Sequence, residues 1–93
     1  MKVRFETYGR IRAIIGKKEV ELEFEEGTTI ERAIKYFARS FGSELESLLF
    51  NDGKLASFFS IQVDSKTVDS NNLTEIQLTD DQTISIIPFV AGG

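Results

Sequence analysis

The stretch EVELEFEEGTTIERAIKYFARSF, residues 19–41, passes from one hydrophobic period to another. In its first part valine, leucine and phenylalanine alternate with glutamates, which is the two-residue period of a strand with one buried and one solvated face. Thr28 and Glu31 then have the spacing of a capping box, which predicts that a helix begins there. We expect the glutamates to form a solvated sheet face rather than a metal site.

The predicted helix has a single apolar stripe. Its apolar residues recur at the three- and four-residue spacing of one helix face, and they are Ile30, Ala33, Ile34, Phe37 and Phe41. Gly42 follows the stripe and is predicted to end the helix in the left-handed conformation. Because such a helix covers one face of a sheet, the stretch predicts a two-layer α+β domain.

The segments around this stretch supply the other elements. Residues 2–6 alternate apolar and charged side chains and predict a strand, and residues 9–16 connect it to the next one. A second short helix is predicted at 43–50, where Ser43 and Glu46 repeat the capping spacing.

The remainder of the chain reads as strands and turns. Asn51-Asp52-Gly53 predicts a turn, and strands are predicted at 58–63 and 83–87, with short pairing segments near Val68 and at 76–78. The helix between the second strand and the later ones leaves room for a parallel pair within the sheet.

Length and composition exclude several classes of protein. The chain has 93 residues, enough for one domain, and 41% of them are hydrophobic. It contains no cysteine and no histidine, so we expect no metal site and no catalysis by this chain alone. No apolar run approaches the ~18 residues that span a bilayer and residues 1–4 do not resemble a signal peptide, so we expect no membrane association and a cytoplasmic location.

The charge of the chain is unevenly distributed. Its net charge is -4, and residues 67–93 carry acidic side chains with no basic residue. An acidic segment is repelled by nucleic acid and attracted to basic protein surfaces, so we expect a protein partner and no nucleic acid.

The segment IIPFVAGG, residues 86–93, ends the sequence. Because proline has no N–H for a ladder, Pro88 predicts that the strand stops there and that residues 88–93 form an extended, flexible tail. The five residues after the proline can reach roughly 17 Å. Glycine has no side chain to clash with close walls, so we expect the tail to thread a narrow channel in a partner. The threading residues are Pro88, Phe89, Val90, Ala91 and Gly92.

The group that such a tail would deliver is the carboxylate of Gly93. A carboxylate is a weak nucleophile and must be activated, for example by attack on the α-phosphate of ATP held by a partner. Sulfur or an amine can then displace the acyl adenylate. The alternative is a frayed end without function, on a binding module whose docking residues would be Phe58 and Phe59 unless the core takes them.

The order of the short motifs resembles the MoaD/ThiS family of ubiquitin-like sulfur carriers, which have the β-grasp fold. The matching segments are YGRIR at 8–12, EGTTI at 26–30, IQVD at 61–64, LTDDQTI at 78–84 and IPFVAGG at 87–93. The chain departs from the family pattern at Ser65 and Asp81, where glycines are usual, at Phe89, which replaces a proline, and in the length of 69–79.

The resemblance implies one β-grasp domain over residues 1–93, with a mixed sheet of four to five strands covered on one face by a helix. It also implies that a ubiquitin-activating-type enzyme uses ATP to adenylate Gly93, which becomes a thiocarboxylate, while the chain itself binds no cofactor. The chain length, the second helix and the proline-containing tail lean toward the molybdopterin branch, in which the acceptor is the large subunit of molybdopterin synthase. Thiamin or tRNA thiolation, and conjugation of Gly93 to lysines as a protein modifier, stay open.

Overall fold

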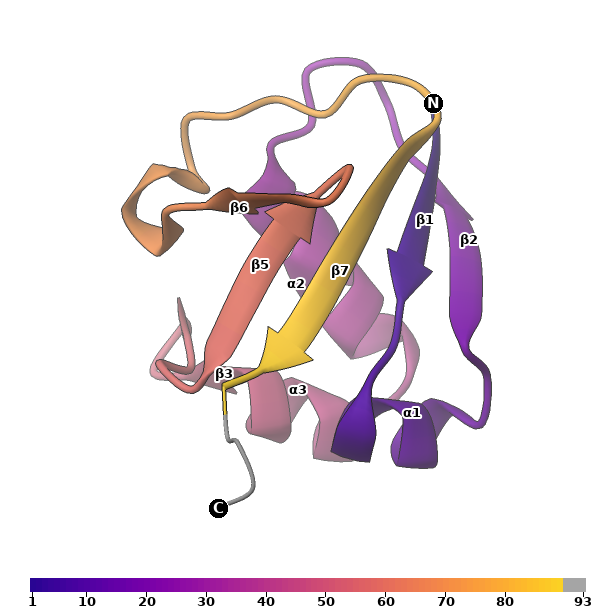
Figure 1. The fold of residues 1–93 in the computed structure, drawn as a ribbon, viewed down its shortest axis with the longest axis vertical. Coiled ribbons are helices and arrows are strands. Elements are labelled where there is room, and N and C mark those ends of the chain that lie inside the picture. Colours follow the sequence, from indigo (N-terminus) through magenta and orange to yellow (C-terminus); the bar gives the residue numbers. More distant parts are fainter. Residues whose placement is uncertain (90–93) are drawn as a thin grey trace.

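The computed structural model describes residues 1–89, so the predictions for Val90, Ala91, Gly92 and Gly93 lie outside the described residues. Figure 1 shows a sheet with helices packed behind it and at one end. The elements are β1 (Lys2–Glu6), α1 (Gly9–Ile15), β2 (Glu19–Glu23), α2 (Ile30–Ser40), α3 (Ser43–Leu49), β3 (Phe50–Asn51), β4 (Lys54–Leu55), β5 (Phe59–Val63), β6 (Lys66–Val68), the 3-10 turn η1 (Ser70–Asn72) and β7 (Gln82–Pro88). The predicted α+β class is confirmed.

The main sheet has five strands in the order β2-β1-β7-β5-β6, and β3 and β4 form a separate hairpin. The two central strands, β1 and β7, run parallel, with Phe5 opposite Ile84, and every other neighbouring pair is antiparallel. The parallel pair that the sequence left room for therefore lies at the centre of the sheet, between residues near the two ends of the chain.

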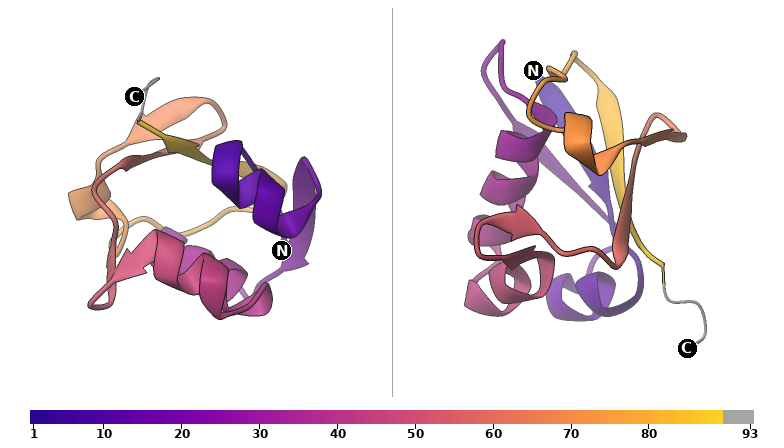
Figure 2. Two further views of the ribbon diagram at one scale, coloured as in Figure 1. Left: turned by 90° about the horizontal axis from the view of Figure 1, so that it is seen from below. Right: turned by 90° about the vertical axis from the view of Figure 1, so that its left-hand side faces the viewer.

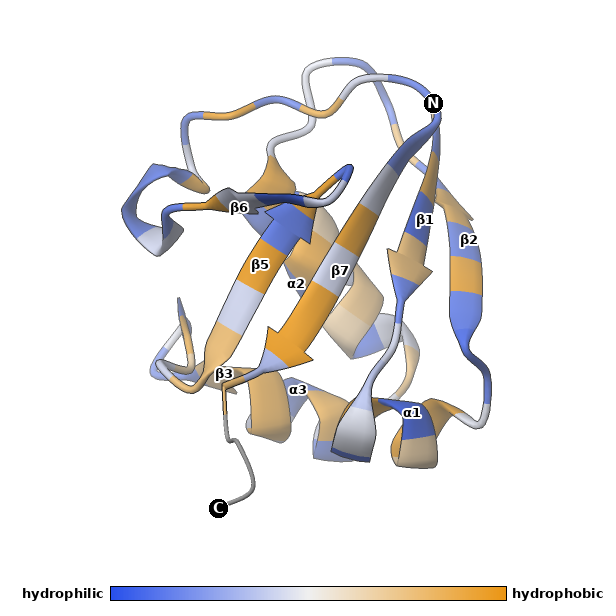
Figure 3. Ribbon diagram, in the orientation of Figure 1, coloured by the Kyte–Doolittle hydropathy of each residue, from blue (hydrophilic) through white to orange (hydrophobic). Residues whose placement is uncertain are grey.

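The core lies between the sheet and α2, which cover each other as two layers (Figure 2). Ile30, Ile34 and Phe37 of the predicted stripe are buried, and the Phe37 ring stacks on that of Phe5 with centroids 4.4 Å apart. The strands show the expected alternation of apolar and polar residues (Figure 3). The apolar stripe thus faces the sheet as the sequence predicted, although Phe41 is only half-buried.

The connection predicted at 9–16 contains a helix that the sequence pattern does not predict. Helix α1 is only seven residues long, and it buries Ile11. Gly16 ends it in the left-handed conformation (φ 79°, ψ 10°), and its N–H donates to the carbonyl of Arg12 at 2.7 Å. A helix of two turns shows too few repeats for its period to be recognised.

The predicted helix caps are wrong by one residue or absent. The N-cap of α2 is Thr29, whose hydroxyl accepts from the N–H of Arg32, whereas the hydroxyl of Thr28 donates to Glu25. The backbone explains the shift, because the carbonyl of Thr28 accepts from the N–H of Leu78 and thus pairs with a distant segment. This pairing holds Thr28 outside the helix, which begins after Thr29.

Gly42 has a positive φ, as expected, but an extended ψ (φ 101°, ψ 172°), so it is not in the left-handed helical conformation. It serves as the N-cap of α3, and no side chain caps that helix. The capping role predicted for Ser43 and Glu46 is therefore wrong. Helix α3 itself is present where the sequence predicted it, and Leu45 and Leu49 form its buried side.

Ser65 and Asp81, the two turn positions where the resemblance leads one to expect glycine, have a positive φ. Asp64 and Ser65 have φ of 49° and 71° in the turn between β5 and β6, as a two-residue turn of type I′ requires. Asp81 has φ 67° just before β7. Ser65 and Asp81 therefore adopt a backbone conformation that glycine adopts more readily.

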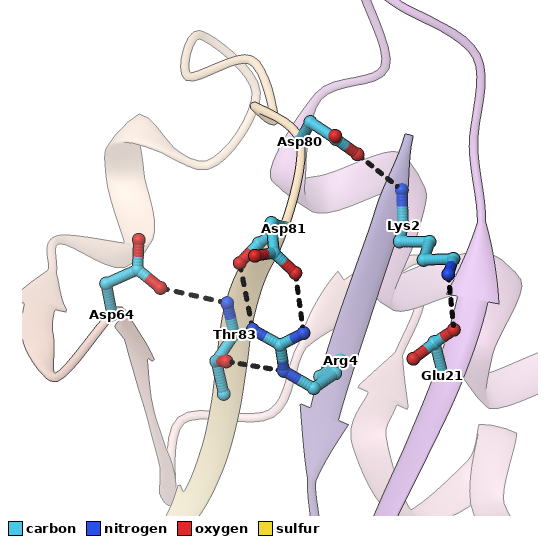
Figure 4. Close-up of polar contacts among 7 residues, drawn as sticks. All are labelled: Lys2, Arg4, Glu21, Asp64, Asp80, Asp81 and Thr83. Atoms are coloured by element: carbon cyan, nitrogen blue, oxygen red, sulfur yellow. Dashed lines mark hydrogen bonds and ion pairs between the residues drawn. The ribbon is translucent and has the colours of Figure 1, made fainter.

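Figure 4 shows the polar contacts that hold the start of β7 against β1. The guanidinium of Arg4 donates to the carboxylate of Asp81 at 2.7 Å, to its carbonyl at 3.0 Å and to the hydroxyl of Thr83 at 3.3 Å. The hydrogen bond and the charge of Arg4 lower the pKa of Asp81 below its usual 3.8, and Asp81 in turn raises the pKa of Arg4. This cluster fixes the register of the central pair at the end of the sheet remote from Pro88.

The lowered pKa predicts an acid-dependent loss of stability. A carboxyl whose pKa is lower in the folded state stabilises the fold above its ordinary pKa, and the contribution disappears as the pH falls through the lowered value. We expect the free energy of unfolding of the wild type to fall more steeply below about pH 4 than that of Asp81→Asn. Asparagine tolerates a positive φ, so the variant removes the charge and keeps the turn. Urea unfolding at a series of pH values measures this, and parallel curves would contradict it.

Within residues 1–89 no helix is long and apolar enough to cross a membrane.

Candidate functional site at the end of β7

Strand β7 leads the chain to the candidate site at the lower end of the sheet (Figure 1). It runs through Pro88, which lies opposite Phe59, so the prediction that the strand stops before the proline is wrong. Next to the Phe59–Pro88 pair, the N–H of Phe89 donates to the carbonyl of Phe58 at 2.7 Å. The strand pairing at this point therefore uses the N–H of Phe89 and needs none from Pro88. On its other side β7 pairs with β1 only as far as Ser85. The missing N–H of Pro88 therefore breaks no hydrogen bond on either side.

The N-terminal turn of α1 lies against this proline. Gly9 has φ 54°, and a Cβ built on it would stand 3.5 Å from Cγ of Pro88. A Cβ at that distance would make an ordinary van der Waals contact, so it is the positive φ, and not lack of space, that favours glycine at this position of the YGRIR motif. The proximity of Gly9 and Pro88 follows from the parallel pairing of β1 with β7, so the two motifs that contain them do not predict it.

A polar network lies on the uncovered face of the sheet beside the site. The carboxylate of Glu6 accepts from the hydroxyl of Ser85 at 2.7 Å and from that of Tyr8 at 3.5 Å. Ser85 is only 5% exposed, so its hydroxyl needs this partner. The network joins β1 and β7 just before the chain reaches Pro88.

The two phenylalanines considered for docking have different surroundings. Phe59 belongs to the core and is 7% exposed, so its assignment to a docking surface is wrong. It is the first residue of β5 and belongs to the core, as do Ile61 and Val63, which alternation along the strand places on the same face. Phe58 precedes the strand and is 48% exposed.

Phe89 is the last residue that the structure describes, and 61% of its surface is exposed. The predicted site residues are therefore divided. Pro88 is packed at the end of the sheet, Phe89 lies at the surface, and the remaining predicted residues, Val90 to Gly93, fall outside the described part of the chain. Among residues 1–89 no cluster of three acidic side chains is arranged to hold a metal ion.

Comparisons with known proteins identify the family. The ThiS family model matches residues 6–93. A protein of Archaeoglobus fulgidus named "Putative sulfur carrier protein" is 32% identical over 84 residues, which cover 90% of this chain and 94% of that protein.

Solved structures agree on the fold. SAMP1 from Haloferax volcanii superposes with a TM-score of 0.85 at 17% identity, with all of both chains covered. A chain of the Amycolatopsis orientalis BexX/CysO complex superposes with a TM-score of 0.78 at 27% identity, and the match covers 98% of this chain and 99% of that one. The expected ubiquitin-like β-grasp is confirmed by these likenesses together with the mixed five-stranded sheet. The chain belongs to the ThiS family of ubiquitin-like sulfur carriers.

Proposed function

We propose that this chain carries sulfur as a thiocarboxylate on Gly93, and that a ubiquitin-activating-type enzyme prepares Gly93 by adenylation with ATP. The observation that carries the proposal is the position of Phe89, which β7 brings to the surface at the end of the sheet with 61% of its area exposed. The family match supports it, because it extends through residue 93.

The chemistry requires two displacements at the Gly93 carboxyl group. A carboxylate oxygen attacks the α-phosphorus of ATP, and pyrophosphate leaves, which gives an acyl adenylate. A hydrosulfide equivalent from a sulfur donor then attacks the acyl carbon; the bond to AMP breaks, a proton is released and the thiocarboxylate remains. This chain has no cysteine or histidine, so the activating partner must supply the general base and the magnesium-bound nucleotide.

We assign the sulfur acceptor to a molybdopterin-synthase-like large subunit. The second helix, one of the sequence features that favoured this branch, is present as α3 and buries Leu45 and Leu49. In this role the chain is the small subunit of a two-component enzyme, and it has no catalytic activity alone.

The test uses the full chain with a cognate adenylating enzyme, ATP and sulfide, followed by intact-mass measurement. We expect a mass change equal to exchange of one oxygen for sulfur, dependent on ATP and localised to Gly93 by fragmentation. The protein that carries the thiocarboxylate should then transfer its sulfur to a pterin precursor when a large synthase subunit is added. Absence of the sulfur exchange would overturn the carrier function. A glycine-glycine remnant on substrate lysines, with no sulfur transfer to the pterin, would instead identify a protein modifier.

A further inference from the structure

The sheet has two outer strands, β2 and β6, of different length. Strand β6 has three residues, whereas β2 has five and pairs along its whole length with β1. In Figure 1 β2 is the outermost strand on the right, and no helix or strand of residues 1–89 lies beyond it. Strand β2 therefore presents the longer open edge of the sheet.

The hydrogen bonds between β2 and β1 show which backbone groups face this edge. The N–H of Phe24, just after β2, donates to the carbonyl of Met1 at 2.8 Å. Bonded and non-bonded residues alternate along an antiparallel pair, and the register continues unbroken through β2. The even-numbered residues of β2 therefore bond to β1. The odd-numbered residues point their backbone N–H and C=O groups toward the open edge, and they are Glu19, Glu21 and Glu23.

The same glutamates make the edge acidic. Residues 19–26 contain five glutamates and no basic residue. Glu21 is 51% exposed and approaches Lys2 at 3.8 Å, and Glu23 is 71% exposed and lies 3.6 Å from the N-terminal amine (Figure 4 draws the first of these pairs). Exposed pairs of this kind contribute little, so the carboxylates stay available to charges on a partner.

The side of the edge that faces α2 is apolar. Val20 and Leu22 are only half-buried where they pack against the core. Tyr36 of α2 is 55% exposed, and its ring meets that of Phe24 edge-on with centroids 5.5 Å apart. Tyr36 therefore borders the end of β2 on this side. A strand added to β2 would cover these apolar groups with every second side chain.

The charge pattern decides what can occupy the edge. Only the odd-numbered residues of β2 can bond outward, so a second copy of this chain would bring glutamate opposite glutamate, which is unfavourable. A strand with basic residues at those positions would instead gain an opposite charge at each one. The edge thus favours a basic partner over self-association.

We propose that β2 binds an extended segment of a partner protein as an added antiparallel strand. Basic residues of the segment lie opposite Glu19, Glu21 and Glu23, and apolar residues between them lie on the side of Tyr36. Strand β1 separates β2 from β7, so the bound segment leaves the end of β7 uncovered. The proposal is independent of the chemistry at Gly93.

The experiment titrates the isotope-labelled full chain with the peptide acetyl-Lys-Val-Lys-Val-Lys-amide and follows backbone amide signals by NMR. We expect saturable shifts concentrated at residues 19–23 and slower hydrogen exchange at the three glutamates. In the added strand the lysine N–H groups face β2 and the valine N–H groups face away. N-methylation of the lysine backbone nitrogens should therefore weaken binding about tenfold or more. The matched control is the same peptide N-methylated at both valines, which should bind within about threefold of the unmodified one.

A pair of charge variants tests the acidic contribution. Glu21→Gln should weaken binding of the unmodified peptide about two- to fivefold, as for loss of one exposed charge pair. Asp52→Asn, in the turn between β3 and β4, removes an equally exposed charge away from β2 and should leave binding unchanged. Asparagine tolerates the positive φ of Asp52, so this control keeps its turn.

Three results would overturn the proposal. The first is equal weakening by the two kinds of N-methylation, and the second is equal weakening by the two charge variants, since either means attraction by charge without strand pairing. The third is the absence of shifts at residues 19–23 with millimolar peptide. None of these results bears on the carrier function, because the measurement does not involve the Gly93 carboxyl group.

Discussion

Deletion of Gly93 is expected to abolish thiocarboxylate formation and to leave the free energy of unfolding unchanged. The deletion moves the terminal carboxyl group back by one residue, about 3.5 Å, from the position where the nucleotide would be held. Since misplacement by about 1 Å can cost a factor of ~100 in rate, we expect adenylation to fall by at least about 100-fold. Pyrophosphate release and intact mass measure the loss, and urea unfolding measures the stability.

Gly93→Ala is the matched control for this deletion. It keeps the length of the chain and its terminal carboxylate but adds one methyl group, so it separates the position of the carboxylate from the need for glycine. We expect it to retain more activity than the deletion, with a reduction caused by the close walls of the channel. A deletion variant that gained sulfur at the wild-type rate would contradict the assignment of Gly93.

Phe37→Ala is expected to cause the largest loss of stability among single core substitutions that leave the site unchanged. Phe37 is fully buried, stacks on Phe5 and contacts Phe41 edge-on at 5.5 Å. Truncation of a buried phenylalanine costs about 3–5 kcal/mol, a large part of the ~5–15 kcal/mol that stabilises a domain. We expect the melting temperature to fall on the order of 20 °C.

The neighbouring residue provides the control for Phe37. Tyr36 lies on the same helix and is 55% exposed, with one edge-on contact to Phe24. Tyr36→Ala should therefore cost less than about 1 kcal/mol. Thermal and urea unfolding of both variants give the comparison. Equal losses would show that the stacked pair is not the centre of the core.

The sequence predicts those parts of the fold that repeat a period. The alternation in residues 2–6 and 19–25 and the stripe from Ile30 to Phe37 are confirmed, because burial of one face is the main force that orders these elements. The errors occur where one residue is decided by a distant one. Thr28 does not cap the helix because its carbonyl pairs with the N–H of Leu78. Helix α1 is too short for its apolar residues to repeat with a recognisable helical period.

The candidate site follows the same rule. The motif at the end of the chain is the basis of the proposed chemistry, and the exposure of Phe58 agrees with one of the two outcomes considered for it. Pro88 can stay in the strand because no ladder hydrogen bond on either side requires an N–H at this position. The local sequence does not show which residues will pair with Pro88.

The pairing of β1 with β7 has a consequence for the kinetics of folding. Glu6 and Ser85 are bonded across 79 positions of the chain, so the centre of the sheet forms only when a loop of nearly the whole polypeptide closes. Contacts of such long range slow folding, because the loop must close before these contacts can form, whereas helices relax locally in about a microsecond. The strand that completes the core is also the strand that leads to Phe89. A partner that recognises this end of the sheet therefore selects molecules that have finished folding.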